Sequence, residues 1–190
     1  MRKKPMLAYP VSKKPIDYSK PVFVQPKLDG VRCVIQYEWK DAHDYVVKAY
    51  SRTGKPWKNI DHILEQLKPF FKKFPDVILD GELYNHDLRD DFEKIISLVR
   101  KSKPTAEDRL DAEKLTQFHC YDIIDETKTF EERSRFIQQN VPRNHCIIHV
   151  PTTHGMCSED QAKAIHKMNL KLGYEGSILR TNDKYACKRS

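Results

Sequence analysis

Residues 25–32, Gln-Pro-Lys-Leu-Asp-Gly-Val-Arg, combine the side chains that covalent catalysis by a lysine requires. An unprotonated amine can attack an electrophile such as a phosphorus atom, and a nearby cation together with partial desolvation favours that form. Lys27 is therefore the candidate nucleophile, with Arg32 as the fixed cation. An ordinary charged hairpin would contain the same residue types, so this segment alone leaves both interpretations open.

Two apolar stretches flank Lys27 and favour strands, Pro21–Val24 before it and Cys33–Ile35 after it. The Asp29-Gly30 dipeptide between them predicts a tight antiparallel hairpin that holds Lys27 at the rim of a cleft. Further along the chain, strands and helices alternate irregularly. This pattern predicts an α+β fold, in which antiparallel sheets are flanked by helices.

Proline spacing divides the chain into an arm and a domain. Three prolines within residues 1–20 predict an extended N-terminal arm, and residues 21–190 are expected to form a single domain. Helices are predicted near 61–74, with Pro69 kinking or breaking the first, near 88–101, and from about residue 129. Residues 101–115 are interpreted as an exposed loop that can contain a helical piece.

The last predicted helix has the clearest boundaries. Ser158 and Gln161 resemble a capping box, and Gly173 is expected to end the helix. The apolar spacing predicts one buried stripe, formed by Ala162, Ile165, Met168 and Leu172.

The composition of the 190 residues is that of a soluble protein with a polyanionic partner. The formal net charge is +7, which favours nucleic acid, and no apolar run is long enough for a membrane span. Five scattered cysteines, an odd number, argue against a disulfide scaffold and for a reducing compartment. We expect a monomer in the cytoplasm, the nucleus or a viral replication site, and not a secreted protein.

Four further segments follow Lys27 in a fixed order: Ser51–Lys55, Leu79–Leu83, Phe118–Ile124 and Tyr174–Arg180. Each alone is a weak signal. In this order they resemble the motif series of the lysine-nucleotidyltransferase superfamily, which comprises ATP-dependent DNA ligases, RNA ligases and capping guanylyltransferases. The versions found here look most like the adenylation domain of ATP-dependent DNA ligases, and the resemblance implies an ATP-grasp-like nucleotidyltransferase fold.

The resemblance implies a reaction. Lys27 would attack the α-phosphate of ATP and keep AMP as a covalent lysyl adduct. The AMP would pass to the 5′-phosphate of nicked double-stranded DNA, and the 3′-hydroxyl would then seal the nick. Mg²⁺ is the expected metal, because it combines a few carboxylates with phosphate oxygens and water.

The resemblance also assigns roles to residues of this chain. Metal binding falls to Glu82 and Glu175, and nucleic-acid binding to Arg52 and Lys55. The nucleotide site would comprise Gln25, Lys27, Arg32, Arg52, Glu82, Tyr121 and Lys188. Gln25 stands where DNA ligases commonly have a glutamate that reads the adenine amino group, and its amide also offers a donor, which leaves the choice of ATP over GTP open.

The sequence stops at Arg189-Ser190, before the paired lysines of the family's final core motif. We therefore expect a core truncated before that motif, without the OB-fold domain that follows in the family. Such a chain would bind adenine nucleotide but seal nicks poorly alone. Two alternatives remain: the core of an RNA ligase, and a non-catalytic relative that binds nucleotide or nucleic acid.

Overall fold

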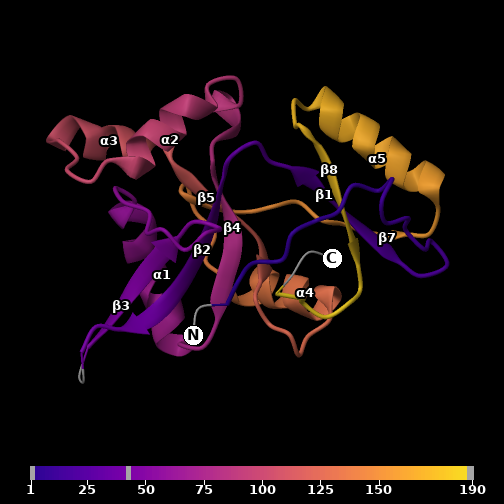
Figure 1. Ribbon diagram of the computed structural model, residues 1–190, viewed down its shortest axis with the longest axis horizontal. Coiled ribbons are helices and arrows are strands. Elements are labelled where there is room, and N and C mark those ends of the chain that lie inside the picture. The colour runs from indigo at the N-terminus through magenta and orange to yellow at the C-terminus, as the bar shows by residue number, and fades with distance from the viewer. Residues whose placement is uncertain (1–2, 42–43, 188–190) are drawn as a thin grey trace.

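The computed structural model describes residues 3–41 and 44–187, which form two β-sheets with helices around them (Figure 1). The smaller sheet has the strand order β7-β1-β8, with β1 Val22–Lys27, β7 Thr153–Met156 and β8 Gly176–Thr181. The larger has the order β3-β2-β4-β5-β6 and comprises β2 Val31–Trp39, β3 Tyr45–Tyr50, β4 Ile78–Tyr84, β5 Gln117–Ile123 and β6 Ile147–His149. The α+β class is confirmed. Pairing is antiparallel except between β5 and β6, which are parallel.

The predicted hairpin at Asp29-Gly30 is wrong. Strands β1 and β2 do not pair, because β1 belongs to the smaller sheet and β2 to the larger one. Gly30 is not among the glycines with positive φ; instead, a Cβ there would lie 2.5 Å from the Leu83 carbonyl oxygen and 2.7 Å from Glu82 Cγ. The glycine thus lets the chain cross closely over β4, and this crossing joins the two sheets beside Lys27.

The helices cover the two sheets unequally. Helix α1 (Asp61–Lys73) packs near β3, and α4 (Phe130–Asn140) packs on β5. The short η1 (His86–Leu88), α2 (Phe92–Arg100) and α3 (Ala106–Leu115) follow β4, whereas α5 (Glu159–Lys171) packs on the smaller sheet (Figure 1). The start of α4 also reaches that sheet, where Phe130 contacts Phe23 of β1. The main core therefore belongs to the larger sheet; its fully buried members include Ile35, Leu67, Phe71, Leu79 and Phe118.

Two helix predictions need correction, and the helical piece expected within residues 101–115 is confirmed but longer than a loop would allow. Pro69 does not break α1, because it lies on the exposed face, where water can satisfy the carbonyl left without its usual donor. The helix predicted from residue 88 begins only at Phe92, after the separate turn of η1. The predicted loop 101–115 contains the ten residues of α3, which begins with a capping box between Thr105 and Asp108.

The buried stripe predicted for α5 is also wrong in part. Ala162 is buried, but Met168 and Leu172 are 47% and 55% exposed. The inward face instead carries Asn169, whose Nδ2 donates to Ser177 Oγ on β8 at 2.8 Å. A three-stranded sheet can cover only a narrow part of a helix, so a small residue and an amide fill the contact. The predicted boundaries hold, since Ser158 accepts from the Gln161 N–H and Gly173 has φ +84°.

Within the described residues, no helix combines the length and apolarity needed to cross a membrane.

Candidate active site

Lys27 forms an ion pair with Glu175 where β1 meets β8. Lys27 is the last residue of β1 and pairs in register with Gly176, the first residue of β8, so Glu175 lies directly beside it. Lys27 Nζ donates to Glu175 Oε1, and the two side chains are 45% and 44% exposed. The amine is thus accessible. The charged group next to it is the Glu175 carboxylate, whereas the sequence suggested a cation, Arg32, as its neighbour.

Glu82 and Tyr121 come from neighbouring strands of the larger sheet, β4 and β5. The Tyr121 hydroxyl donates to Glu82 Oε2 at 3.1 Å. Burial raises the pKa of Glu82 to about 8, although the Arg32 charge and the Tyr121 hydrogen bond oppose the shift. Burial also raises the pKa of the Tyr121 phenol, so the phenol remains a donor. Two opposing effects therefore set the charge of Glu82: burial favours the protonated form, and nearby cations favour the carboxylate.

Arg32 and Asp80 form a bidentate ion pair. Arg32 Nε and Nη2 donate to the two Asp80 oxygens, each at 2.6 Å, and Nη2 also donates to the Met6 carbonyl at 3.0 Å. Burial lowers the pKa of the guanidinium, but the charge and hydrogen bond of Asp80, together with the nearby Tyr121 and Tyr185, outweigh burial and raise it. The Arg32 guanidinium also lies 5.2 Å from the centre of the Tyr121 ring. Arg32 is thus a fixed cation beside Tyr121.

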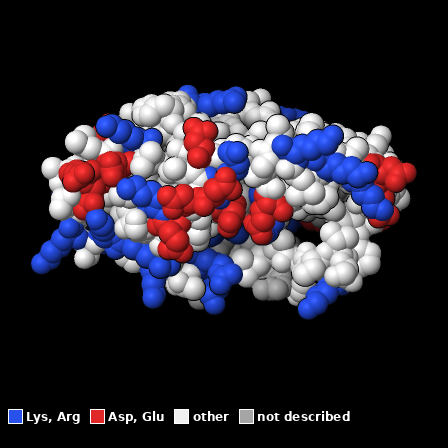
Figure 2. All heavy atoms as spheres, turned by 90° about the horizontal axis from the view of Figure 1, so that it is seen from above, with Lys and Arg blue, Asp and Glu red and all other residues white. Residues whose placement is uncertain are grey.

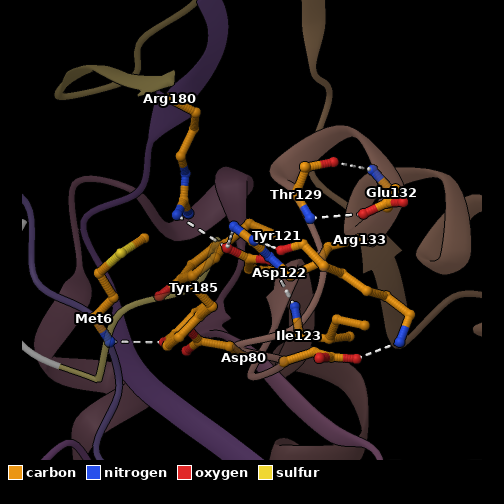
Figure 3. A network of polar contacts seen from close by, with 12 residues as sticks. Met6, Asp80, Tyr121, Asp122, Ile123, Thr129, Glu132, Arg133, Arg180 and Tyr185 are labelled. Carbon is orange, nitrogen blue, oxygen red and sulfur yellow. Dashed lines mark hydrogen bonds and ion pairs between the residues drawn. The ribbon is translucent and has the colours of Figure 1, made fainter. Parts of the chain in front are cut away.

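A second buried carboxylate, Asp122, organises the ends of the two sheets (Figure 3). Asp122 is fully buried and accepts from Arg133 Nε at 2.7 Å and from Arg180 Nη1 at 3.1 Å. Arg133 comes from α4 and Arg180 from β8, so this carboxylate ties the smaller sheet to the larger one. The Arg180 guanidinium also lies 5.6 Å from the Tyr121 ring centre.

Tyr185 joins this arrangement from the segment after β8. Its hydroxyl donates to Asp80 Oδ2 at 2.6 Å and accepts from the Met6 backbone N–H at 2.7 Å, and the residue is 2% exposed. The N-terminal arm and the C-terminal segment therefore meet at the carboxylate that holds Arg32.

The Gln25 side chain is buried and enclosed by protein partners. Its Nε2 donates to the Tyr121 carbonyl at 3.1 Å and to Thr152 Oγ1 at 3.0 Å, while its Oε1 accepts from Arg180 Nε at 3.1 Å. Gln25 and Lys27 are two residues apart on β1 and so share one face of the strand.

The remaining predicted residues are either exposed on a turn or outside the residues that the structure describes. Arg52 and Lys55 are exposed on the turn 51–55, which closes through Ser51 N–H to the Lys55 carbonyl at 2.7 Å. Trp57 anchors this turn to β2 by donating its Nε1 to the Arg32 carbonyl at 3.0 Å. Lys188 lies outside the described residues.

Asp80, Asp122 and Arg180 lie within the motif segments of the chain, but their sequence positions alone assigned them no role. Carboxylates inside apolar strands, Leu79-Asp80 and Tyr121-Asp122-Ile123, were the available signal, because a buried acid needs cationic partners. Arg133 and Tyr185 carried no local signal, since their partners lie on distant segments. Together these residues form the buried support of the site. Of the candidate residues they surround, Lys27 and Glu175 are exposed, and Glu82 and Tyr121 are half-buried.

The family profile described as "ATP dependent DNA ligase domain" matches residues 5–189. The chain belongs to this family. The DNA ligase of African swine fever virus (isolate Tick/South Africa/Pretoriuskop Pr4/1996) is 29% identical over 164 residues, which cover 83% of this chain and 36% of the viral ligase. The ligase domain described here thus spans about a third of the length of that relative.

Two solved structures show the same ligase fold. One, described as "DNA binding with a minimal scaffold: Structure-function analysis of Lig E DNA ligases", matches with TM-score 0.71 and 20% identity over 100% of this chain and 66% of that one. The Chlorella virus DNA ligase-adenylate matches with TM-score 0.60 and 20% identity over 98% of this chain and 64% of that one. At this identity the likeness shows the fold alone.

Proposed function

We propose that Lys27 carries AMP as the first step of DNA ligation. The observation that supports this most strongly is the Lys27–Glu175 pair: an accessible amine fixed at a strand end, with a carboxylate beside it. The amine, once it has lost a proton, attacks the α-phosphorus of ATP. A nitrogen–phosphorus bond forms, the bond to pyrophosphate breaks, pyrophosphate leaves with its electron pair, and the attached nitrogen loses a second proton to water.

Glu175 has to release Lys27 before this attack, because an ion pair stabilises the charged amine. A divalent cation beside Glu175 would draw the carboxylate away from the lysine. Exposure makes this exchange inexpensive, since an ion pair that reaches water contributes at most about 1 kcal/mol.

Magnesium fits the donor chemistry of Glu175 and Glu82, which would hold it with hard carboxylate oxygens. The described residues contain no cluster of three or more metal-ligating side chains, so phosphate oxygens of the nucleotide would complete the coordination. When bound, the ion would neutralise charge on the departing pyrophosphate. A nearby cation would also favour the charged form of Glu82, whose pKa is about 8.

Three other side chains are suited to hold the nucleotide. Arg32 is a permanent cation for a ribose or phosphate oxygen, and the Tyr121 ring is suited to stack on the purine. Gln25 faces the same side of β1 as Lys27 and is suited to read the base. Lys188 keeps its assignment to the nucleotide as a prediction.

Nucleic acid is the proposed second substrate. Arg52 and Lys55 would contact the nicked strand from their exposed turn, and α5 adds Lys163, Lys167 and Lys171, all exposed. Figure 2 shows basic side chains along the surface over α5, whereas acidic side chains gather toward α2 and α3. In the family's sequence of steps, AMP then passes to a 5′-phosphate and the 3′-hydroxyl displaces it. A further domain such as an OB-fold would close on the nicked duplex.

The first test measures the intact mass of the protein after incubation with ATP and Mg²⁺. We expect a gain of one AMP that pyrophosphate reverses and that Lys27→Ala lacks. Offering the adenylated protein nicked DNA and nicked RNA in parallel then compares the two substrates, and faster loss of AMP on DNA is expected. Absence of any AMP gain in a folded protein that binds ATP would favour the non-catalytic alternative; faster transfer to RNA would favour an RNA ligase.

A further inference from the structure

The turn that precedes Glu175 is fastened by His86 to the end of β4. This turn, residues 172–174, leads from α5 into β8, whereas His86 belongs to η1, which follows β4. His86 Nε2 lies 2.7 Å from the Leu172 carbonyl oxygen, and the imidazole packs on the ring of Tyr174 with 4.3 Å between the ring centres. A side chain beside the larger sheet thus holds the backbone next to a carboxylate of the smaller sheet.

The neighbours of His86 fix which of its ring nitrogens carries the proton. The Leu172 carbonyl can only accept a hydrogen bond, so Nε2 must donate to it. In the neutral ring Nδ1 is then an acceptor, and the Tyr84 hydroxyl, 2.7 Å away, donates to it. Burial raises the pKa of the Tyr84 phenol to about 12, so this donor keeps its proton. Tyr84, the last residue of β4, therefore holds His86 in the tautomer that bonds Leu172.

The packing of η1 on this turn is close. Gly173 has φ +84°, and a Cβ there would lie 2.7 Å from Arg89 Nε. Arg89 Nη1 in turn donates to the His86 carbonyl at 3.0 Å. The glycine therefore serves both the turn of the backbone and the close approach of Arg89.

The two carboxylates assigned to the metal come from different sheets. Glu82 lies on β4, two residues before Tyr84 and on the same face of the strand. Glu175 immediately precedes β8 and follows the turn that His86 bonds. Tyr84 and His86 therefore connect the strand of Glu82 to the backbone next to Glu175.

We propose that His86 is a positioning residue that holds Glu175 where it can share one divalent cation with Glu82. His86 itself binds neither nucleotide nor metal, and it acts through the backbone of residues 172–174. The inference rests on the proposed function and deepens it, because it gives a part in metal binding to a residue outside the motif segments.

Binding of α,β-methylene ATP, which cannot transfer AMP, tests the inference separately from the chemistry. Calorimetry gives its dissociation constant without divalent metal and with saturating Mg²⁺, and the ratio of the two constants measures the gain in affinity that the metal provides. His86→Asn and His86→Gln are a matched pair, because the amide of asparagine reaches only as far as Nδ1, whereas that of glutamine reaches as far as Nε2.

The wild-type protein should bind the analogue more tightly with Mg²⁺. His86→Asn loses the donor to Leu172 and should reduce this gain about fivefold, the fold-change that one hydrogen bond produces, with the metal-free dissociation constant unchanged. His86→Gln keeps the donor and should keep most of the gain. In a Glu175→Ala background, His86→Asn should cause no further loss, because the carboxylate that His86 positions is then absent.

Equal gains in the two His86 variants, whether both kept or both lost, would overturn the inference, because the bond to Leu172 would then not decide metal binding. A merely structural role of His86 would weaken binding with and without Mg²⁺ alike and leave the ratio unchanged. Losses that multiply in the double variant would show that His86 does not act through Glu175. A Glu175→Ala protein with the full gain would instead contradict the proposed metal role of Glu175, and a folded wild-type protein that binds no nucleotide would overturn the proposed function itself.

Discussion

Two kinds of ion pair border the same site, and they differ in their access to water. Lys27 and Glu175 are 45% and 44% exposed, whereas the side chains of Asp80 and Asp122 are fully buried against arginines. An exposed pair can exchange partners at little cost, but a buried charge that loses its partner pays the full desolvation penalty. The difference suggests that the exposed pair opens during the reaction, while the buried pairs hold the two sheets in register.

The largest effect is expected at the exposed pair. Lys27→Ala should abolish the gain of AMP because no other group replaces the amine, and should change the free energy of unfolding by less than about 1 kcal/mol. Intact mass and urea denaturation measure the two quantities. A variant that unfolds readily would show that Lys27 is structural.

The buried pairs should behave in the opposite way. Asp122→Asn leaves Arg133 and Arg180 without a negative partner, and we expect a loss of ~3–5 kcal/mol in the free energy of unfolding. Glu159→Gln, which removes the exposed Glu159–Lys163 pair on α5, is the matched control and should leave the denaturation midpoint unchanged. Equal midpoints for the two variants would remove the distinction between exposed and buried pairs.

The pH response of Glu82 sharpens the comparison, because this group is half-buried and forms no ion pair among the described residues. Burial raises its pKa from 4.5 to about 8, so the folded protein holds this proton more tightly than the unfolded chain. The resulting stabilisation is complete below pH 4.5 and is lost as the pH rises toward about 8.

If the charged form of Glu82 is needed, the rate of AMP attachment should rise from pH 7 to pH 9, by at most about tenfold, because a bound cation would ionise part of the Glu82 population already at pH 7. Glu82→Gln should be slower and should show a smaller rise. The same pH dependence in both proteins would assign the titration to another group. A pH range above 6.5 keeps His119 neutral, since burial lowers its pKa to about 4.

The smallest effect is expected at Tyr185, which supports the buried set through its hydroxyl. Tyr185→Phe removes the bond to Asp80 and leaves the Met6 N–H without its acceptor, at a cost of ~1–2 kcal/mol. Tyr174→Phe serves as control, because the described contact of Tyr174 is ring packing on His86. Urea denaturation measures both, and equal losses would contradict the role given to the Tyr185 hydroxyl.

The sequence pointed to candidate site residues in short motifs, whereas it gave little sign of the residues that support them. Lys27 and Glu175 lie in short motifs whose order predicted the fold class and the family, and the structure brings them together. The support depends on contacts between distant segments, such as Asp122 with Arg133 and Arg180, which no local pattern encodes.

Local patterns also misled where tertiary contacts decided the outcome. Asp29-Gly30 has the composition of a turn, but Gly30 serves a close crossing over β4. The spacing of Met168 and Leu172 is that of a buried stripe, yet the smaller sheet is too narrow to cover them.

The most direct test of this account is to locate AMP on the chain. The protein is incubated with ATP and Mg²⁺, digested under conditions that preserve phosphoramidates, and its peptides are fragmented by tandem mass spectrometry. We predict that AMP is found on Lys27. AMP on another lysine, or none on a folded protein that binds ATP, would contradict the assignment of Lys27 as the nucleophile.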